Sequence, residues 1–92
     1  MKEKVDETRY SNAARKYIKK LTPSEKMKLR EIIHLRLEML PADGDIKPLQ
    51  GFSDGRMRLR TGGIRIIYRY DEDGILLILS ILDIGPRGDI YK

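Results

Sequence analysis

The sequence contains no cysteine and no tryptophan, and it has a single histidine, His34. Without cysteine the chain cannot form disulfides, thiolate nucleophiles or cysteine-ligated zinc and iron–sulfur sites. No segment approaches the roughly 18 consecutive apolar residues that a membrane-spanning helix needs. We therefore expect a cytoplasmic protein with no membrane partner, in which any metal would have to be bound by carboxylates and His34.

The residues that are present make the chain basic. Nineteen lysines and arginines face 14 acidic residues, so the formal net charge of the 92 residues is +5. A chain of this length forms one domain, residues 1–92, and is too short for a two-domain enzyme. The positive charge favours nucleic acid, an anionic surface or an acidic protein as partner.

Two helices are predicted in the first half of the chain. Apolar residues recur every three or four positions over residues 13–21, after Ser11 or Asn12 as N-cap. A second helix is expected to begin after Thr22, because Thr22, Pro23 and Glu25 have the layout of a capping box, and to continue until Pro41. Its expected buried stripe is Leu29, Ile32, Ile33, Leu37 and Leu40. The short connection predicts an antiparallel hairpin of helices.

Strands are predicted in the second half, after a loop at residues 46–53. Residues 56–60 alternate arginine with apolar residues, which predicts a strand with one solvent-exposed basic face. A turn at Gly62 and Gly63 leads to a strand at residues 64–70. A further turn at residues 71–74 precedes an apolar central strand at 75–82. The prediction is an α+β fold in which an N-terminal helical hairpin packs on a small antiparallel sheet; residues 4–10 alternate too weakly to be assigned by pattern alone.

Five arginines lie between residues 56 and 69 with no acidic residue among them: Arg56, Arg58, Arg60, Arg65 and Arg69. If the two glycines form a two-residue turn, the arginines of both strands share one face of the sheet. Their mutual repulsion would then be relieved by a bound anion, and the planar guanidinium group suits phosphate. A solvated polar face is the alternative interpretation. The C-terminal residues add Arg87, Lys92 and Tyr91, the last being either a base-stacking group or a core residue.

Other residues carry no comparable signal. His34 is expected to be an ordinary helix-surface residue, because it has no second histidine or other partner with ligand spacing. The glycine pair lacks the spacing of a phosphate-binding loop, and Asp43, Asp45 and Asp54 lack that of a calcium loop.

Four blocks of sequence, in the same order, resemble the RelE/ParE superfamily of toxins from type II toxin–antitoxin systems, with RelE-type mRNA interferases the most similar. The blocks are residues 13–21 (AARKYIKKL), 45–51 (DIKPLQG), 58–68 (RLRTGGIRIIY) and 84–92 (IGPRGDIYK). The resemblance implies a helical hairpin on a twisted antiparallel sheet. Because the family fold usually opens with a strand, it also favours a strand within residues 4–10.

The resemblance further implies a ribosome-dependent endoribonuclease that cleaves mRNA in the A site by attack of the RNA's own 2′-hydroxyl, without a metal, and so inhibits translation. Arg56 and Arg58 match two basic positions that are lysines in the best-known members. Arg65 matches an arginine that holds the scissile phosphate, Arg87 one proposed to protonate the leaving oxygen, and Tyr91 an aromatic residue that stacks on the nucleotide. Further RNA-binding residues are expected at Arg60, Arg69 and Lys92.

The arginines at positions 56 and 58 depart from the family pattern. Arginine is almost never deprotonated in proteins, so neither residue can accept the proton of the 2′-hydroxyl. Lys92, Lys47 and a ribosomal group stay open as acceptors, and the alternative is that most of the rate comes from positioning of the RNA alone. The family's partners are the ribosome, mRNA and a co-encoded, acidic antitoxin, with promoter DNA bound through the antitoxin complex. The alternatives are a ParE-like inhibitor of DNA gyrase and a weakly active homologue that serves mainly as an antitoxin-bound co-repressor.

Overall fold

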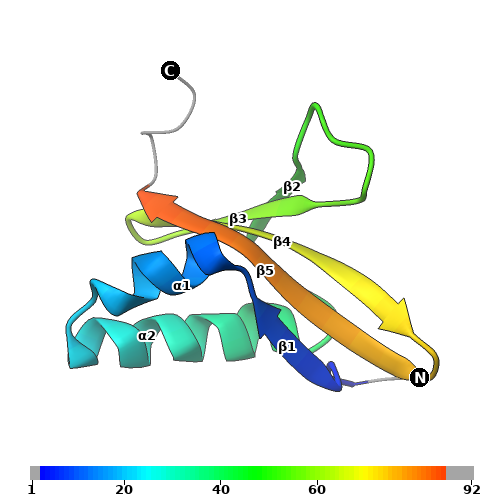
Figure 1. Cartoon of the computed structure of the whole chain (residues 1–92), viewed down its shortest axis with the longest axis horizontal. Coiled ribbons are helices and arrows are strands. Elements are labelled where there is room, and N and C mark those ends of the chain that lie inside the picture. Colours follow the sequence, from blue (N-terminus) through cyan, green and yellow to red (C-terminus); the bar gives the residue numbers. More distant parts are fainter. Residues whose placement is uncertain (1–2, 87–92) are drawn as a thin grey trace.

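Two helices lie on one side of a five-stranded sheet in the computed structural model of the chain, which describes residues 3–86 (Figure 1). The strands are β1 (Glu7–Tyr10), β2 (Asp45–Pro48), β3 (Met57–Thr61), β4 (Ile64–Asp73) and β5 (Leu76–Pro86). The helices are α1 (Asn12–Lys19) and α2 (Pro23–Ile33), which continues as a single π-helical turn, η1 (His34–Glu38). The predicted α+β fold with an N-terminal helical hairpin is confirmed. No helix within residues 3–86 is both long and apolar enough to cross a membrane.

The strand order is β1-β5-β4-β3-β2, so the predicted antiparallel meander of β3, β4 and β5 forms the middle of the sheet. One edge is β1, which confirms a strand within residues 4–10 but runs parallel to β5, so the sheet is mixed. The other edge is β2, which pairs antiparallel with β3. The prediction of a loop over residues 46–53 is therefore wrong for its first three residues, which belong to β2.

Local capping explains why both helices begin where they do. The hydroxyl of Ser11 accepts a hydrogen bond from the Ala14 N–H at 3.1 Å and donates one to the Leu82 carbonyl at 2.6 Å, so the same side chain caps α1 and ties it to β5. Thr22 and Glu25 form the predicted capping box at the start of α2. The helical segment ends at Glu38, before the predicted Pro41, because Leu40 donates its N–H to the carbonyl of Glu3.

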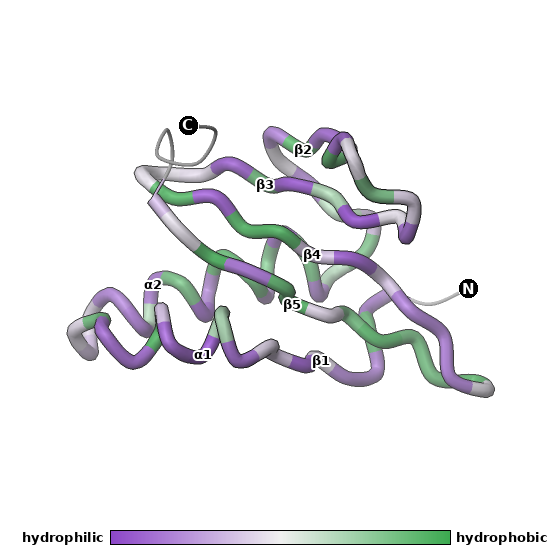
Figure 2. Tube along the Cα trace, turned by 45° about the horizontal axis from the view of Figure 1, so that its top comes forward, coloured by the Kyte–Doolittle hydropathy of each residue, from purple (hydrophilic) through white to green (hydrophobic). Residues whose placement is uncertain are grey.

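The hydrophobic core lies between the helices and the sheet. Its buried members are Val5, Ala14, Leu29, Ile33, Leu37, Leu59, Ile66, Tyr68, Leu79, Ile81 and Ile84. The predicted stripe of the second helix is confirmed, because three of its five residues are buried and Ile32 and Leu40 pack against them. Figure 2 shows hydrophobic residues concentrated along β4 and β5 and alternating with hydrophilic ones along β3. This alternation sends every second side chain of β3 to the face that the helices do not cover.

The two hairpin turns differ from each other in how well the sequence located them. Gly62 (φ +58°) and Gly63 form the predicted two-residue turn between β3 and β4. The next turn was predicted at residues 71–74, but β4 runs through Asp73 and the turn is Gly74 and Ile75. The acidic residues before Gly74 therefore extend the β4–β5 hairpin.

Replacing Gly44 by alanine is expected to lower the free energy of unfolding by about 1–3 kcal/mol. Gly44 has a φ of +121°, and a Cβ there would lie 2.7 Å from Cδ1 of Leu59, which is fully buried. Gly63 is the matched control, since its φ is outside the left-handed region and a Cβ would meet nothing within 4 Å. Urea unfolding should place G63A within about 0.5 kcal/mol of the parent chain; equal stabilities of G44A and G63A would contradict the prediction.

Candidate nucleic-acid interface

The β3–β4 hairpin places three of the predicted arginines on the sheet face opposite the helices. Arg60 pairs directly with Arg65 across the hairpin, and Arg58 pairs with Ile67. Directly paired residues of antiparallel strands point to the same face, so Arg58, Arg60 and Arg65 share one surface. We refer to these three residues as the arginine triad. The juxtaposition expected from the two-residue glycine turn is thereby confirmed for Arg60 and Arg65.

Arg58 is buried, so the prediction of a uniformly solvent-exposed basic face is wrong at this position. Its side chain is only 6% exposed, and its Nη2 lies 3.7 Å from Oδ1 of Asp45 without a hydrogen bond to any described residue. The cause is β2, which the sequence did not reveal: it flanks β3 and places Lys47 directly opposite Arg58. A buried guanidinium nitrogen without an acceptor is costly, and an anion bound beside it would remove that cost.

A hollow of about 390 Å³ opens beside Arg58. Arg58 lines it together with Lys47, Pro48, Leu49 and Gln50. Lys47 is exposed, and its pairing with Arg58 directs both cationic side chains to the same face of the sheet. The hollow therefore combines two positive charges with an unsatisfied donor, which is a suitable environment for a phosphate group.

Arg56 and Arg69 lie apart from the triad, in an ion-pair cluster built around Asp54. Asp54 accepts hydrogen bonds from Nη2 of Arg56 at 2.7 Å and from Nη1 of Arg69 at 2.6 Å. The hydrogen bond from the Arg56 side chain, joined by that from Arg69, holds the pKa of the Asp54 carboxyl well below its usual range. Arg69 also binds Asp71, which accepts a hydrogen bond from Ser80. We refer to Asp54, Arg56, Arg69 and Asp71 as the Asp54 cluster.

The cluster corrects the expectation that all five arginines would require an external anion. The acidic residues in the flanking segments return to the same face and neutralise Arg56 and Arg69 internally. Both guanidinium groups have pKa values raised above the usual range, chiefly by the hydrogen bond to Asp54 for Arg56 and to Asp71 for Arg69. Lys47 and the arginine triad therefore form a part of the basic face that is separate from the Asp54 cluster.

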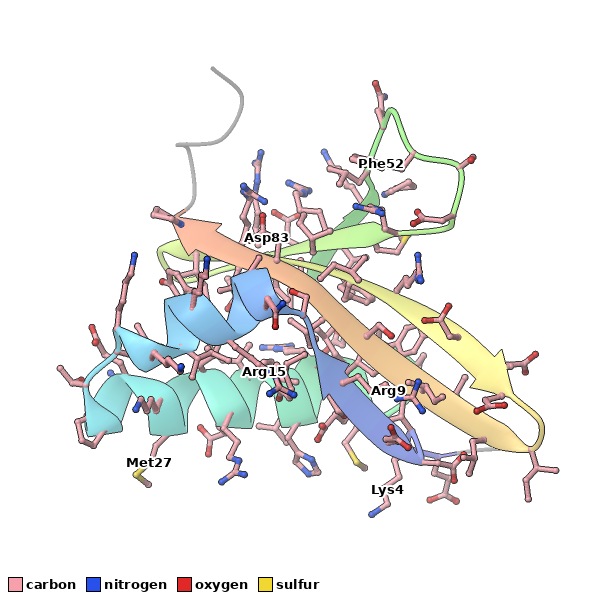
Figure 3. The ribbon with its side chains drawn as sticks, viewed as in Figure 1. Lys4, Arg9, Arg15, Met27, Phe52 and Asp83 are labelled. Atoms are coloured by element: carbon pink, nitrogen blue, oxygen red, sulfur yellow. The ribbon has the colours of Figure 1, made fainter. Side chains whose placement is uncertain are left out.

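Strand β5 lies beside the triad, where it contributes the carboxylate of Asp83 and a glycine, Gly85, next to Arg65. Gly85 pairs with Arg65, and a Cβ added at Gly85 would lie 3.9 Å from Nη2 of Arg65. Asp83 pairs with Ile67 and so points to the same face as the triad, as Figure 3 shows on the side of the sheet away from the helices. Asp83 was not among the predicted site residues, because the predicted strand ended at residue 82 whereas β5 continues to Pro86. The alternation of side chains beyond residue 82 is the signal that would have included it.

The remaining predicted residues are not all placed by the structure. Arg87, Tyr91 and Lys92 lie outside the described residues, and their roles stay predictions. His34 is exposed, as expected, with its Nδ1 3.1 Å from Oε1 of Glu38. Within residues 3–86 no group of three or more metal-ligating side chains is present. The triad, Lys47 and Asp83 thus form the described part of a surface that can bind a phosphate group and hold a carboxylate nearby.

Comparisons with known proteins bear on the fold of the whole chain. No protein-family model matches the sequence, and no curated protein matches it significantly. A chain of the toxin–antitoxin complex RelBE2 from Mycobacterium tuberculosis is 27% identical, with 96% of this chain and 98% of that chain aligned and a TM-score of 0.72. A chain of the archaeal RelE–RelB complex from Pyrococcus horikoshii is 23% identical, covers 90% of this chain and 96% of that chain, and has a TM-score of 0.58. The protein is therefore RelE-like in fold over nearly its whole length, and the resemblance to RelE-type toxins is confirmed.

Proposed function

We propose that the chain is the toxin of a type II toxin–antitoxin system and that it cleaves mRNA on the ribosome. The likeness to chains of two RelE–RelB complexes supports the toxin assignment. The observation that carries the nuclease proposal is the arginine triad, above all the buried guanidinium of Arg58 with an unsatisfied Nη2. Such a group is expected where an anion binds, and the phosphate backbone of RNA supplies one.

The reaction is attack of a ribose 2′-hydroxyl on the adjacent phosphate, with release of the 5′-oxygen of the next nucleotide. Negative charge grows on the non-bridging phosphate oxygens as the new P–O bond forms. Arg60 and Arg65, paired across the hairpin, bind these oxygens, and Arg58 binds from the neighbouring position on β3. Guanidinium groups fixed before the reaction stabilise the transition state more than the ground state, which is the source of the rate enhancement.

Asp83 is the proton acceptor in this proposal. Arginine cannot take the proton of the 2′-hydroxyl, and a protonated lysine has no lone pair. Asp83 is on the face of the triad, two residues along β5 from the partner of Arg65, a diagonal separation of about 7–8 Å that long side chains span. On the leaving-group side, where the family resemblance places Arg87, its guanidinium donates a hydrogen bond that stabilises the departing 5′-oxygen, and that oxygen takes its proton from solvent. Tyr91 stacks on the nucleotide, as the resemblance implies, and Lys92 binds the RNA backbone.

Replacing Asp83 by asparagine should lower the single-turnover cleavage rate about 100-fold, because the amide cannot accept the proton. Lys47→Met is the matched control: it removes a phosphate-binding charge, so it should raise the RNA concentration at half-maximal rate and leave the maximal rate within about threefold. Quenched-flow cleavage of mRNA on programmed ribosomes separates the two quantities. A maximal rate that falls with K47M and not with D83N would contradict the proposal and would show that Lys47, not Asp83, accepts the proton.

The antitoxin is proposed to be a co-encoded acidic protein. The net charge of +5 and the gathering of Lys47 and the arginine triad on one face of the sheet favour a partner with acidic side chains. Binding there would cover the RNA site, and the complex, not the isolated chain, would bind promoter DNA. Titration of the purified chain with the product of the adjacent reading frame tests this proposal; absence of a complex at micromolar concentration would contradict it.

The decisive experiment for the function is cleavage of a defined mRNA by the purified chain with programmed ribosomes. The expected result is a cut within the A-site codon that appears only when ribosomes are present. Intact mRNA in that assay would contradict the proposal. If cells expressing the chain instead form filaments and accumulate DNA breaks while bulk mRNA survives, the gyrase-directed alternative is correct; if neither occurs, the co-repressor alternative is favoured.

A further inference from the structure

The loop between β2 and β3 exposes the only phenylalanine of the chain. Phe52 is 52% exposed, and it is on the side of the sheet away from the helices (Figure 3). An exposed aromatic ring makes no contribution to the core, which lies on the opposite face. Single exposed apolar side chains are common, so what distinguishes Phe52 is the surroundings of its ring.

The ring is held in place by the Asp54 cluster. The guanidinium carbon of Arg56 lies 3.9 Å from the centroid of the Phe52 ring. Nε and Nη2 of Arg56 both bind the Asp54 carboxylate, at 3.0 and 2.7 Å, and the same carboxylate binds Arg69 on β4. One side of the ring is therefore covered by a guanidinium group that is itself anchored to the sheet, and the exposed remainder of the ring is presented to solvent with little conformational freedom.

Phe52 and Arg56 belong to the β2–β3 loop, which also contributes residues to the phosphate-binding hollow. Arg56 is two residues before Arg58, a separation of about 7 Å along an extended chain. Gln50 and Leu49, from the same loop as Phe52, line the hollow with Lys47 and Arg58. An anion site and an exposed aromatic ring on one loop are the two components with which proteins bind single-stranded nucleic acid.

We propose that Phe52, backed by Arg56, is a stacking platform for one nucleobase of single-stranded RNA, whose phosphate lies in the hollow beside Lys47 and Arg58. The base stacks on the exposed part of the ring, and Arg56 strengthens the stack by polarising the ring from its covered side. This subsite rests on the proposed nuclease function and extends it: it binds a nucleotide next to the cleaved linkage without taking part in the reaction. It is sequence-tolerant, because every base has a π-face.

Equilibrium binding of the purified chain to a short 2′-O-methylated oligoribonucleotide tests the platform, since such an RNA cannot be cleaved through its 2′-oxygen. A single abasic position is moved along the oligonucleotide. One position should weaken binding to the wild type about 5- to 150-fold, the equivalent of one lost stack. F52A should bind the intact oligonucleotide more weakly by the same factor and show no further loss at that position.

Conservative variants separate stacking from a structural role of the ring. F52Y keeps the π-face and should bind like the wild type, whereas F52L keeps apolar volume without a π-face and should bind like F52A. Ile75→Ala removes an apolar side chain that is even more exposed than Phe52, 88% at the β4–β5 turn, and should leave binding unchanged. Wild-type affinity of F52L, or equal sensitivity of F52A and the wild type to every abasic position, would overturn the platform.

The F52W variant adds an optical readout, because the chain contains no other tryptophan. Its fluorescence should be quenched when the intact oligonucleotide binds and should recover with the abasic one; equal quenching by both would overturn the proposal. Failure here is distinguishable from failure of the proposed function. A chain that cleaves mRNA on ribosomes but shows no dependence on Phe52 lacks the platform alone, whereas a chain that neither binds the oligonucleotide nor cleaves mRNA lacks both.

Discussion

Replacing Arg65 by alanine should lower ribosome-dependent mRNA cleavage about 100- to 1,000-fold. Arg65 is on β4 at the centre of the triad, paired with Arg60 on one side and with Gly85 on the other. Its planar fork can donate two hydrogen bonds to the phosphate oxygens on which charge develops, so its removal costs transition-state stabilisation more than RNA binding. The single-turnover rate at saturating ribosome concentration is the quantity to measure.

Two variants distinguish the loss of a positioned guanidinium from a general loss of charge. R65K keeps the charge but not the fork, and should recover only part of the rate. R9A removes one arginine from the exposed face of β1, at the opposite edge of the sheet, where Arg9 is paired with Glu7. It should cleave within about twofold of the parent chain. Cleavage by R65A at the parental rate would remove the triad from the reaction.

The helices were predictable because the signals that begin them are local. Ser11 caps α1 within three residues of chain, and the Thr22–Glu25 box does the same for α2. The end of the second helix depends on a distant contact, the hydrogen bond from Leu40 to Glu3. No pattern within the helix encodes that partner, so the predicted end was too late.

The sheet shows the same division between local and distant information. The β3–β4 hairpin follows from two glycines and alternating residues, but β1 and β2 are four-residue edge strands whose pairing partners lie elsewhere in the chain. Alternation over four residues is too short to distinguish a strand from a loop. A parallel partner such as β1 is separated from β5 by almost the entire chain, so no turn signal announces it.

The candidate site was predictable to the same extent as the fold, because local signals located part of it and distant contacts determined the rest. The alternation of side chains and the two-residue glycine turn predicted that Arg60 lies opposite Arg65, and both of these signals are local in sequence. The burial of Arg58 depends on the overlooked strand β2, and the link between Arg69 and the Arg56 ion pair depends on Asp54, 15 residues from Arg69. Side-chain alternation therefore predicted that Arg60 and Arg65 share a face, whereas the burial of Arg58 and the ion pairs of Arg56 and Arg69 follow from the tertiary structure.

Two tyrosines of β4 make the fold sensitive to alkaline pH. Tyr68 and Tyr70 lie edge to face with ring centroids 5.6 Å apart, and the Tyr70 hydroxyl donates a 2.6 Å hydrogen bond to the carbonyl of Leu37. Tyr68 is 1% exposed, and burial raises the pKa of its hydroxyl to about 12. Burial, and secondarily the neighbouring Tyr68, also raise the pKa of Tyr70 above its usual value.

The free energy of unfolding should therefore fall steeply above pH 10. Below the unfolded-state pKa of about 10, both the folded and the unfolded state keep the phenolic proton, and the contribution of Tyr68 to stability is complete. Between pH 10 and 12 only the folded state keeps the proton. Each unit of pH in this range therefore lowers the free energy of unfolding by about 1.4 kcal/mol, or about 2.7 kcal/mol in all. Y68F keeps the ring and cannot ionise, so its unfolding free energy, from urea titrations followed by circular dichroism, should decline less steeply by that amount. Lysines are common to both chains and cancel in the difference, as does the part of the Tyr70 shift that burial causes; the smaller part that Tyr68 causes is removed together with the Tyr68 hydroxyl. Parallel pH profiles for the two chains would show that the hydroxyl of Tyr68 ionises as readily in the folded state as in the unfolded chain.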